Sequence, residues 1–277
     1  MEIPDILDLD AIATEHDAVA SAGRQVPAYT ARYPGFSNDD GYDVARRVHR
    51  LRLARGEKPA GRKIGFTNTT IWALYDVHEP MWGTMYESTC VRAAGSAARC
   101  TLERYRTFCE PRIEPEIAFG LLRPVSSTES LEQILDGIEW IAHGFEIVHT
   151  HFPGWKFQAA DTKADNGLHG AYFLGDPKSP KDMGANLIER LATFEVELMR
   201  DGEVRDRGTG ANVLGSPLLA LRHLLAVLEK DPHAQPLEPG EIITTGTLTD
   251  AQPVKPGETW TTRLEGLDLP GMTLAFE

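Results

Sequence analysis

Cys109-Glu-Pro-Arg-Ile-Glu-Pro-Glu-Ile-Ala-Phe-Gly-Leu121 contains two carboxylates, Glu114 and Glu116, in a run that otherwise has the composition of a buried strand. Strand side chains alternate faces, so these two point one way while Ile113 and Ile117 point the other. Like charges one pleat apart repel, and carboxylates are rarely buried unpaired. A bound divalent cation relieves both problems, and ligands with only oxygen donors favour magnesium, manganese or calcium over zinc. Two glutamates on a surface strand that face water are the alternative.

A third acidic ligand is expected, because hard cations take several oxygen ligands. Glu146 is the candidate, since it lies in a second apolar run, residues 141–149, that follows a predicted helix. A strand, a helix and a second strand allow the two strands to become neighbours. A glutamate at a helix end or on the surface is the alternative interpretation for Glu146.

Composition and charge exclude several classes of protein. The chain has 277 residues, 42% of them hydrophobic and 25% charged, which is ordinary for a globular protein with a substantial core. The net charge of −13 argues against a general nucleic-acid binder, because attraction to phosphates requires a positive surface. We therefore expect a small-molecule partner and no nucleic acid.

Cysteine usage and hydropathy favour a cytoplasmic protein. Cys90, Cys100 and Cys109 form no CxxC pair and leave an odd count, so they are interpreted as reduced thiols. The acidic N-terminus lacks the basic and apolar regions of a signal peptide. The longest apolar run is interrupted by Arg222 and His223, so no membrane association is expected.

The predicted secondary structure changes near residue 60. Residues 1–60 are predicted to form a helical segment that packs on a catalytic body, residues 61–277, in what is expected to be one structural domain. In the body, local patterns predict a strand at 62–66, a helical turn or two at 69–75, a loop around 80–83, a helix from 126 to about 142, helices at 184–192 and 216–230, and strands at 242–245 and 259–264. Two helices, near 8–22 and from 37 to about 56, are expected before residue 60. The pattern indicates an α-helical cap followed by an α+β body.

Several polar residues outside the glutamates have two interpretations. Lys63, in a short apolar strand, can point into a pocket and balance carboxylates, or can extend to water. Residues 158–170 are predicted to be a loop that approaches a ligand, although Asp161 there can equally serve a turn. Gly246 and Thr247 follow a strand, and their free backbone amides can bind a carboxylate.

Three further signals are weak. Residues 208–215 lack the spacing of a dinucleotide-binding loop, and Ser216 does not lie in a GxSxG sequence. Three histidines, His143, His149 and His151, are close in sequence but form no HExxH motif. His149 and His151 can share one strand face, which leaves a transition-metal site open.

Taken together, seven segments in this order resemble the fumarylacetoacetate hydrolase superfamily, in its branch of 2-hydroxypenta-2,4-dienoate (2-keto-4-pentenoate) hydratases and 4-oxalocrotonate decarboxylases. The segments are residues 61–67, 80–83, 114–119, 145–148, 161–166, 213–217 and 239–247. Each alone is weak, but the ordered set, which covers roughly residues 40 to 265, is highly specific.

The resemblance implies a mixed β-roll of the fumarylacetoacetate hydrolase C-terminal type and a homo-oligomer. It implies that Glu114, Glu116 and Glu146 bind Mg²⁺ or Mn²⁺ and that Lys63 is an active-site lysine. It also places Gly246 and Thr247 where the family holds a substrate carboxylate, and Thr67, which ends the first matching segment, is expected to bind substrate with them. Asp161, at the start of another matching segment, is the remaining catalytic candidate from the resemblance.

The chain also departs from the pattern. Residues 78–81 replace an Asp-Gln-Pro-Asp turn, and residues 167–169 replace smaller side chains. His78 and His169, which lie in these departures, are acid/base candidates specific to this chain.

The function that these features favour is a metal-dependent hydratase, a lyase, acting on a 2-hydroxydienoate or 2-oxo-alkenoate in the catabolism of aromatic compounds. A decarboxylase of the 4-oxalocrotonate type and an acylpyruvate-type C–C hydrolase are alternatives, because one metal site serves all three reactions. A non-catalytic ligand-binding domain with the same fold is the alternative from another class.

Overall fold

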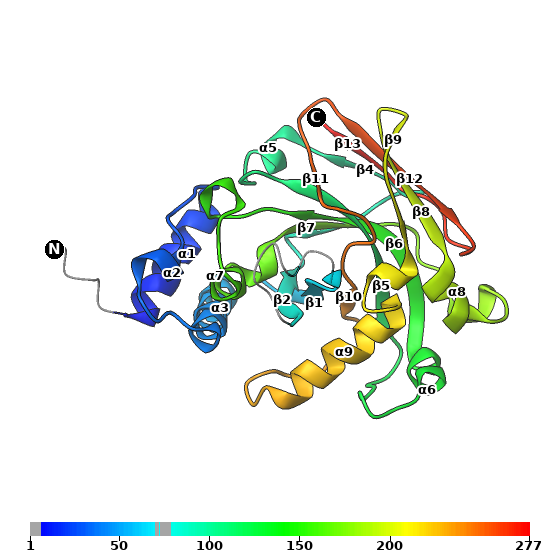
Figure 1. Cartoon of the computed structure of the whole chain (residues 1–277), viewed down its shortest axis with the longest axis horizontal. Helices are drawn as coiled ribbons and strands as arrows, with labels where there is room; N and C mark the ends of the chain where they lie inside the picture. Colours follow the sequence, from blue (N-terminus) through cyan, green and yellow to red (C-terminus); the bar gives the residue numbers. More distant parts are fainter. Residues whose placement is uncertain (1–6, 70–71, 73–78) are drawn as a thin grey trace.

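The computed structural model describes residues 7–69, 72 and 79–277. The helices at the N-terminus lie at one end of the molecule, and the sheets with the remaining helices form the rest (Figure 1). Residues 70–71 and 73–78 are not described, so most of the helical turn expected at 69–75 lies outside the described residues.

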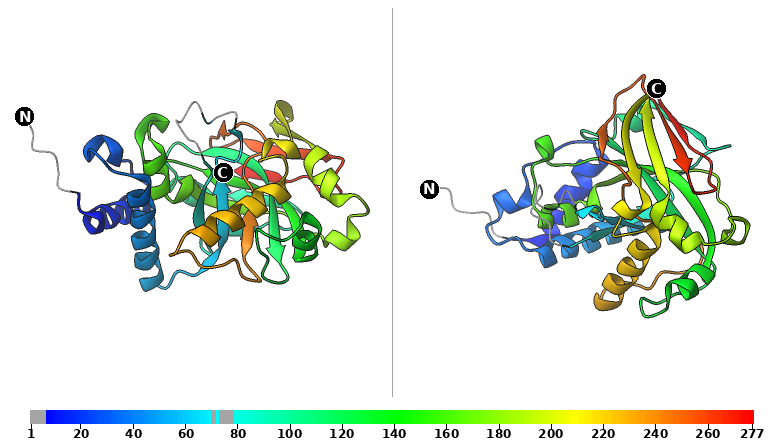
Figure 2. Two further views of the ribbon diagram at one scale, coloured as in Figure 1. Left: turned by 60° about the horizontal axis from the view of Figure 1, so that its bottom comes forward. Right: turned by 45° about the vertical axis from the view of Figure 1, so that its right-hand side comes forward.

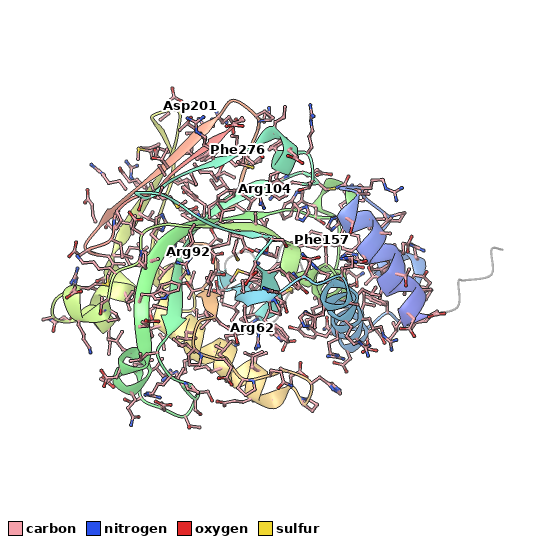
Figure 3. The ribbon with its side chains drawn as sticks, turned by 180° about the vertical axis from the view of Figure 1, so that it is seen from behind. Arg62, Arg92, Arg104, Phe157, Asp201 and Phe276 are labelled. Atoms are coloured by element: carbon pink, nitrogen blue, oxygen red, sulfur yellow. The ribbon has the colours of Figure 1, made fainter. Side chains whose placement is uncertain are left out.

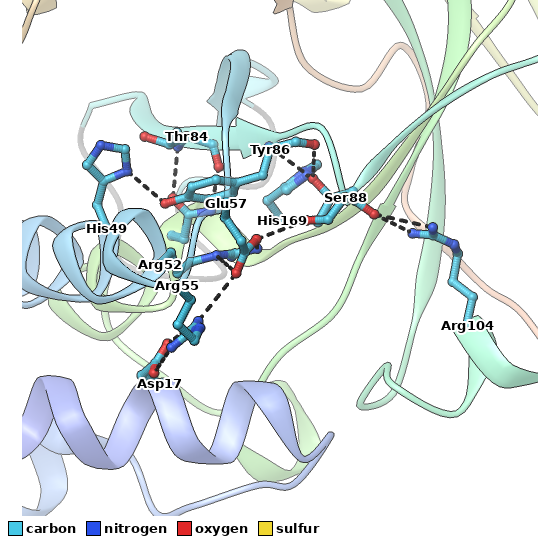
Figure 4. A network of polar contacts seen from close by, with 12 residues as sticks. Asp17, His49, Arg52, Arg55, Glu57, Thr84, Tyr86, Ser88, Arg104 and His169 are labelled. Carbon is cyan, nitrogen blue, oxygen red and sulfur yellow. Dashed lines mark hydrogen bonds and ion pairs between the residues drawn. The ribbon is translucent and has the colours of Figure 1, made fainter.

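The N-terminal segment contains the two expected helices, α1 (Leu9–Ser21) and α3 (Asn38–Ala54), and a short helix that was not predicted, α2 (Tyr29–Arg32). Ser37 and Asp40 form a capping box that starts α3. Arg55, which follows α3, pairs with Asp17 of α1 and with Glu57 (Figure 4). The pair between Arg55 and Asp17 links the end of α3 to α1.

The described strands form two sheets. The larger has the order β2-β1-β10-β5-β6-β7-β3, with β11 paired to β5, and it is mixed because β1/β10 and β3/β7 are parallel pairs. Its strands are β1 (Pro59–Gly65), β2 (Met81–Tyr86), β3 (Cys90–Arg92), β5 (Arg112–Leu121), β6 (Ile138–Val148), β7 (His169–Leu174), β10 (Ile242–Thr244) and β11 (Gln252–Pro253). The smaller sheet has the order β4-β13-β12-β8-β9, from β4 (Ala97–Cys100), β8 (Glu195–Arg200), β9 (Glu203–Thr209), β12 (Thr259–Glu265) and β13 (Thr273–Phe276).

The two sheets pack on each other, and helices cover what remains of the larger one. Phe145 and Phe173 of the larger sheet share a core with Trp260 and Phe276 of the smaller. The helices of the body are α5 (Leu102–Tyr105), α6 (Leu131–Asp136), α7 (Ala159–Ala164), α8 (Leu187–Thr193) and α9 (Pro217–Lys230). Seen from behind, Phe276 lies in the sheet region and Phe157 beside the N-terminal helices (Figure 3). The curled sheets, viewed from two further directions in Figure 2, match the α+β roll with an N-terminal helical cap that was expected.

Helix α9 is strongly apolar. Residues 210–230 are long and hydrophobic enough to span a membrane, by length and composition alone. Half of that window is buried inside the protein, and Leu218, Leu221 and Leu224 of α9 pack in the main core with Ile117 of β5. The helix therefore serves as a core helix of the fold.

Three predicted elements are wrong. Residues 81–83 are not part of a loop, because β2 begins at Met81 and pairs with β1. The helix expected from 126 to 142 is only α6, which is capped by Ser130, and the chain is strand from Ile138 because it pairs with β5 along its length. The loop expected at 158–170 is mostly α7 and a 3₁₀ turn (Asn166–Leu168).

Candidate metal centre

The predicted carboxylates meet at one point of the larger sheet. Glu114 and Glu116 project from the same face of β5, and Glu146 lies directly opposite Glu114 in the antiparallel register with β6. One oxygen from each of the three lies within 4.8 Å of the others. Glu116 and Glu146 are 0% exposed, and Glu114 is partly exposed toward a pocket. The two strands thus deliver the three-oxygen cluster that the sequence predicts.

The electrostatics of the cluster call for a cation. Burial raises the pKa of Glu114, the positive charge of Lys63 lowers it, and the negative charges of Glu146 and Glu116 raise it. The net result is a pKa of about 8. Burial and the charge of Glu146 raise the pKa of Glu116 well above its usual range. Oε1 of Glu116 is buried with no hydrogen-bond partner among the described residues. Such an orphaned carboxylate oxygen beside two further carboxylates fits a hard divalent ion.

Lys63 of β1 lies in the same cluster. Its Nζ donates to the carbonyl of Gly167 at 2.8 Å and lies 3.2 Å from Oε2 of Glu146. Burial lowers the pKa of Lys63, but Glu146, Glu114 and Glu116 outweigh burial and raise it. Lys63 is therefore an ammonium ion that faces the carboxylates, as expected from one of its two interpretations.

His169, at the start of β7, contacts the carboxylate of Glu146. Its Nδ1 lies 2.8 Å from Oε1 of Glu146 and its Nε2 lies 2.9 Å from Oγ1 of Thr89. Burial, Lys63 and Arg52 lower the pKa of His169 well below its usual range, so the ring is neutral. With Glu146 ionised, Nδ1–H of His169 donates to the carboxylate. His169 therefore orients the carboxylate of Glu146, and carboxylates that hold metal ions in proteins are commonly hydrogen-bonded in this way. Figure 4 shows the surroundings of His169.

The expected substrate-binding residues surround a small cavity of about 60 Å³ beside the carboxylates. Thr67, Gly246 and Thr247 all line it. The amide N–H of Gly246 donates to Oε2 of Glu116 at 3.0 Å, so it holds a carboxylate of the cluster. Gly246 has φ of 94°, and a Cβ there would lie 1.8 Å from Oγ1 of Thr67. Only glycine fits this position.

The structure does not bring Asp161 to the cluster. Asp161 is fully buried, and its carboxylate accepts from the amide and hydroxyl of Thr30 and from the amide of Gln158. These contacts favour a structural role that ties α2 to α7. His78 lies outside the described residues.

Arg112 is a charged residue of the pocket that the sequence did not lead us to predict. Arg112 lies on the same face of β5 as Glu114, lines the cavity, and stacks over Trp155 with 3.9 Å from Cζ to the ring centroid. The alternation that pairs Glu114 with Glu116 also assigns Arg112 to their face, so the sequence carried the signal.

Comparisons with known proteins show the family of the chain. The family model for the fumarylacetoacetate (FAA) hydrolase C-terminal domain matches residues 81–269. The chain belongs to this family. It is 30% identical to 2-hydroxyhexa-2,4-dienoate hydratase of Comamonas testosteroni over 246 residues, which is 84% of each chain. It is 30% identical to 4-oxalocrotonate decarboxylase of Pseudomonas sp. strain CF600 over 245 residues, 87% of each chain.

A solved structure of a related protein resembles the present chain over nearly its whole length. The 4-oxalocrotonate decarboxylase of Pseudomonas putida G7, complexed with magnesium and adipate, superposes with a TM-score of 0.85 and 26% identity, covering 98% of this chain and 99% of that one. The similarity includes the N-terminal helices as well as the residues matched by the family model.

Proposed function

We propose that this protein is a hydratase that depends on a divalent metal and adds water to a 2-hydroxydienoate or 2-oxo-alkenoate. The observation that supports it is the cluster of Glu114, Glu116 and Glu146 with Lys63 beside a pocket. The hydratase relatives support the same substrate class. The proposal includes Mg²⁺ or Mn²⁺ as the ion, a cytoplasmic location and a homo-oligomer.

The residues of the site have distinct roles in this proposal. The three glutamates hold the ion, which when bound supplies Lewis-acid stabilisation of negative charge on a substrate carboxylate and C2 oxygen. Lys63, held as an ammonium ion, offsets negative charge that develops on the substrate or relays a proton. His169 fixes the orientation of Glu146 through Nδ1. Water adds to the C4–C5 double bond of the substrate and gives a 4-hydroxy-2-oxo acid.

Incubation of metal-free and metal-loaded protein with 2-hydroxypenta-2,4-dienoate, followed by mass spectrometry of the products, tests the proposal. We expect the product with one added water only with Mg²⁺ or Mn²⁺. Glu116→Gln keeps the size of the side chain and removes its charge, so we expect metal affinity, measured by calorimetry, to fall on the order of 100-fold. Glu139→Gln, on the exposed start of β6, is the matched control and should bind as the wild type does. The absence of turnover of any 2-hydroxydienoate, 4-oxalocrotonate or acylpyruvate with either ion would overturn the enzymatic proposal.

A second candidate, decarboxylation of a 4-oxalocrotonate-type substrate, is favoured by Arg112. In the described part of the chain Arg112 has no ion pair, and it lies two residues before Glu114, about 6.6 Å away along the strand. A guanidinium at this spacing suits the distal carboxylate of a dicarboxylic substrate whose other end reaches the metal.

Arg112→Gln separates the two candidates. If Arg112 binds a distal carboxylate, kcat/KM for 4-oxalocrotonate should fall about 10- to 100-fold, as for loss of a charge-assisted hydrogen bond. The value for a monocarboxylic dienoate should not change. An equal fall for both substrates would contradict the role of Arg112 in recognising a second carboxylate.

A further inference from the structure

A second group of potential metal ligands lies at the far end of the β5–β6 pair. Cys109 precedes β5, and His149 and His151 follow β6, where the amide of Thr150 donates to the carbonyl of Cys109 at 3.1 Å and continues the ladder. One ligand atom from each of the three residues lies within 4.8 Å of the others, and all three residues are buried. None of them belongs to the glutamate cluster, and the proposed reaction uses none of them.

His151 has the surroundings of a metal ligand. Its Nδ1 lies 2.5 Å from Oδ1 of Asp165, whose Oδ2 accepts from the amide of His151 at 3.0 Å. The side chain of His151 is only 4% exposed, and its buried Nε2 has no hydrogen-bond partner among the described residues. A carboxylate on one ring nitrogen fixes the ring and makes the other nitrogen a better ligand. An unpaired buried nitrogen is costly, so this one calls for a partner.

His149 and Cys109 complete the group. The ring of His149 lies 4.6 Å from that of His151, measured between centroids, at an interplanar angle of 72°. The amide N–H of Cys109 donates to Nδ1 of His149 at 3.1 Å. If the ion takes that nitrogen, this one neutral hydrogen bond is lost, which is a small cost beside the binding of a metal by a thiolate and imidazoles. Cys109 forms no disulfide.

We propose that Cys109, His149 and His151 bind one transition-metal ion of the zinc class. One sulfur and two imidazole nitrogens suit zinc or cobalt, whereas the oxygen-only glutamate cluster suits magnesium or manganese. Zn–S and Zn–N bonds of about 2.3 and 2.0–2.1 Å require the three side chains to close in on the ion from ligand atoms that now lie within 4.8 Å of one another. The Cys109 thiol releases its proton to water on binding.

A fourth ligand and an entry route are both available. A cavity of about 390 Å³ is lined by His149 and His151, and also by Arg52, Tyr86 and His169. Water in this cavity can occupy the fourth tetrahedral position. Because Nε2 of His16 in α1 lies 3.2 Å from Oδ1 of Asp165, the ion would join the ends of β5 and β6 to the N-terminal helices through Asp165.

Cobalt titration tests the proposal without relying on activity. Metal-free protein is first saturated with Mg²⁺ and then titrated with Co²⁺, and the absorption band of a cobalt–thiolate bond is recorded. We expect the band to saturate at one equivalent, to disappear on addition of Zn²⁺, and to be absent in Cys109→Ser. Cys90→Ser, at a partly buried cysteine outside the group, is the matched control and should retain the band. Glu116→Gln should also retain it, which separates this site from the proposed catalytic one.

A second variant tests the role of Asp165. Asp165→Asn should keep the band but weaken cobalt affinity on the order of 10–100-fold, as for loss of a carboxylate behind a ligand histidine. A wild-type protein without a thiolate band, or an equal band in Cys109→Ser, would overturn the proposal.

Should Cys109→Ser fail to fold, alkylation of the wild-type protein gives the answer. Zinc should protect Cys109 from iodoacetamide, as read by mass spectrometry, and leave alkylation of Cys90 unchanged. Equal alkylation of Cys109 with and without zinc would contradict the site.

Discussion

Burial of three carboxylates at one point makes the metal-free protein sensitive to pH. The folded protein holds the pKa of Glu114 at about 8 and raises those of Glu116 and Glu146, whereas an unfolded glutamate titrates near 4.5. The folded state therefore binds protons more tightly than the unfolded state does. The associated stability is complete below about 4.5 and is lost as pH rises toward 8.

We expect the melting temperature of metal-free protein to fall between about pH 5 and pH 8, and saturating Mg²⁺ to suppress that fall. The ion replaces the protons as the partner of the carboxylates. Differential scanning fluorimetry across this range, with and without Mg²⁺, measures the effect. A melting temperature of metal-free protein that rises through the same window would show that the carboxylates are not buried together.

Gly246 offers a sharp test at a single position. Replacement by alanine forces a Cβ against Oγ1 of Thr67 at a backbone conformation that L residues rarely adopt. It also disturbs the amide that donates to Glu116. We expect Gly246→Ala to lose both stability and Mg²⁺ affinity, by thermal melting and calorimetry. Gly240→Ala is the control, because Gly240 has a similar φ of 91° but nothing within 4 Å of its Cβ; equal effects of the two would assign the loss to backbone strain alone.

Single residues were the most predictable part of the site. Alternation along one strand was enough to place Glu114 and Glu116 together, because burial on both faces leaves little freedom of register. The role of Asp161 was harder to predict, because it depends on contacts with Thr30, which is distant in sequence. No local pattern distinguishes a carboxylate that binds a ligand from one that binds the backbone of another element.

At the scale of elements, predictions failed where pairing in space overrides local signals. Ser126 and Glu129 have the spacing of a capping box, and the amide of Ser126 does donate to Glu129, but the turn they form is followed by the shorter helix α6. Residues 138–142 then become strand because β5 offers partners for them. Likewise, residues 80–83 look like a turn until β1 is beside them. Helices with strong caps, such as α3, were found correctly because their signal is local.

The link between α2 and α7 gives a prediction at this scale. Asp161→Ala removes a fully buried carboxylate that accepts three hydrogen bonds, so we expect the free energy of unfolding to fall by about 2–4 kcal/mol. Turnover at temperatures where the variant is folded should change little. Urea denaturation and steady-state kinetics measure the two quantities, and Asp176→Ala, at an exposed position, is the control. Lost turnover with unchanged stability would instead support the catalytic role expected from the sequence.

For the whole molecule, the packing bears on whether residues 1–60 form a separate unit. The apolar side chains of α1 and α3, among them Ile12 and Val44, share a core with Phe152 and Ala160 of the body. The contact between Nε2 of His16 in α1 and Oδ1 of Asp165, at 3.2 Å, adds a buried polar link. A helical segment whose apolar face is completed by the rest of the chain has no complete core of its own.

We therefore expect the chain to unfold as one cooperative unit. In differential scanning calorimetry, a single transition with equal calorimetric and van't Hoff enthalpies is the expected result. Removal of residues 1–57 should leave the apolar surface around Phe152 uncovered, so the truncated chain should aggregate or fail to express in soluble form. Two separated transitions, together with a soluble truncated chain that still binds Mg²⁺, would mean that the helical segment is an independent domain and that the shared core contributes little to stability.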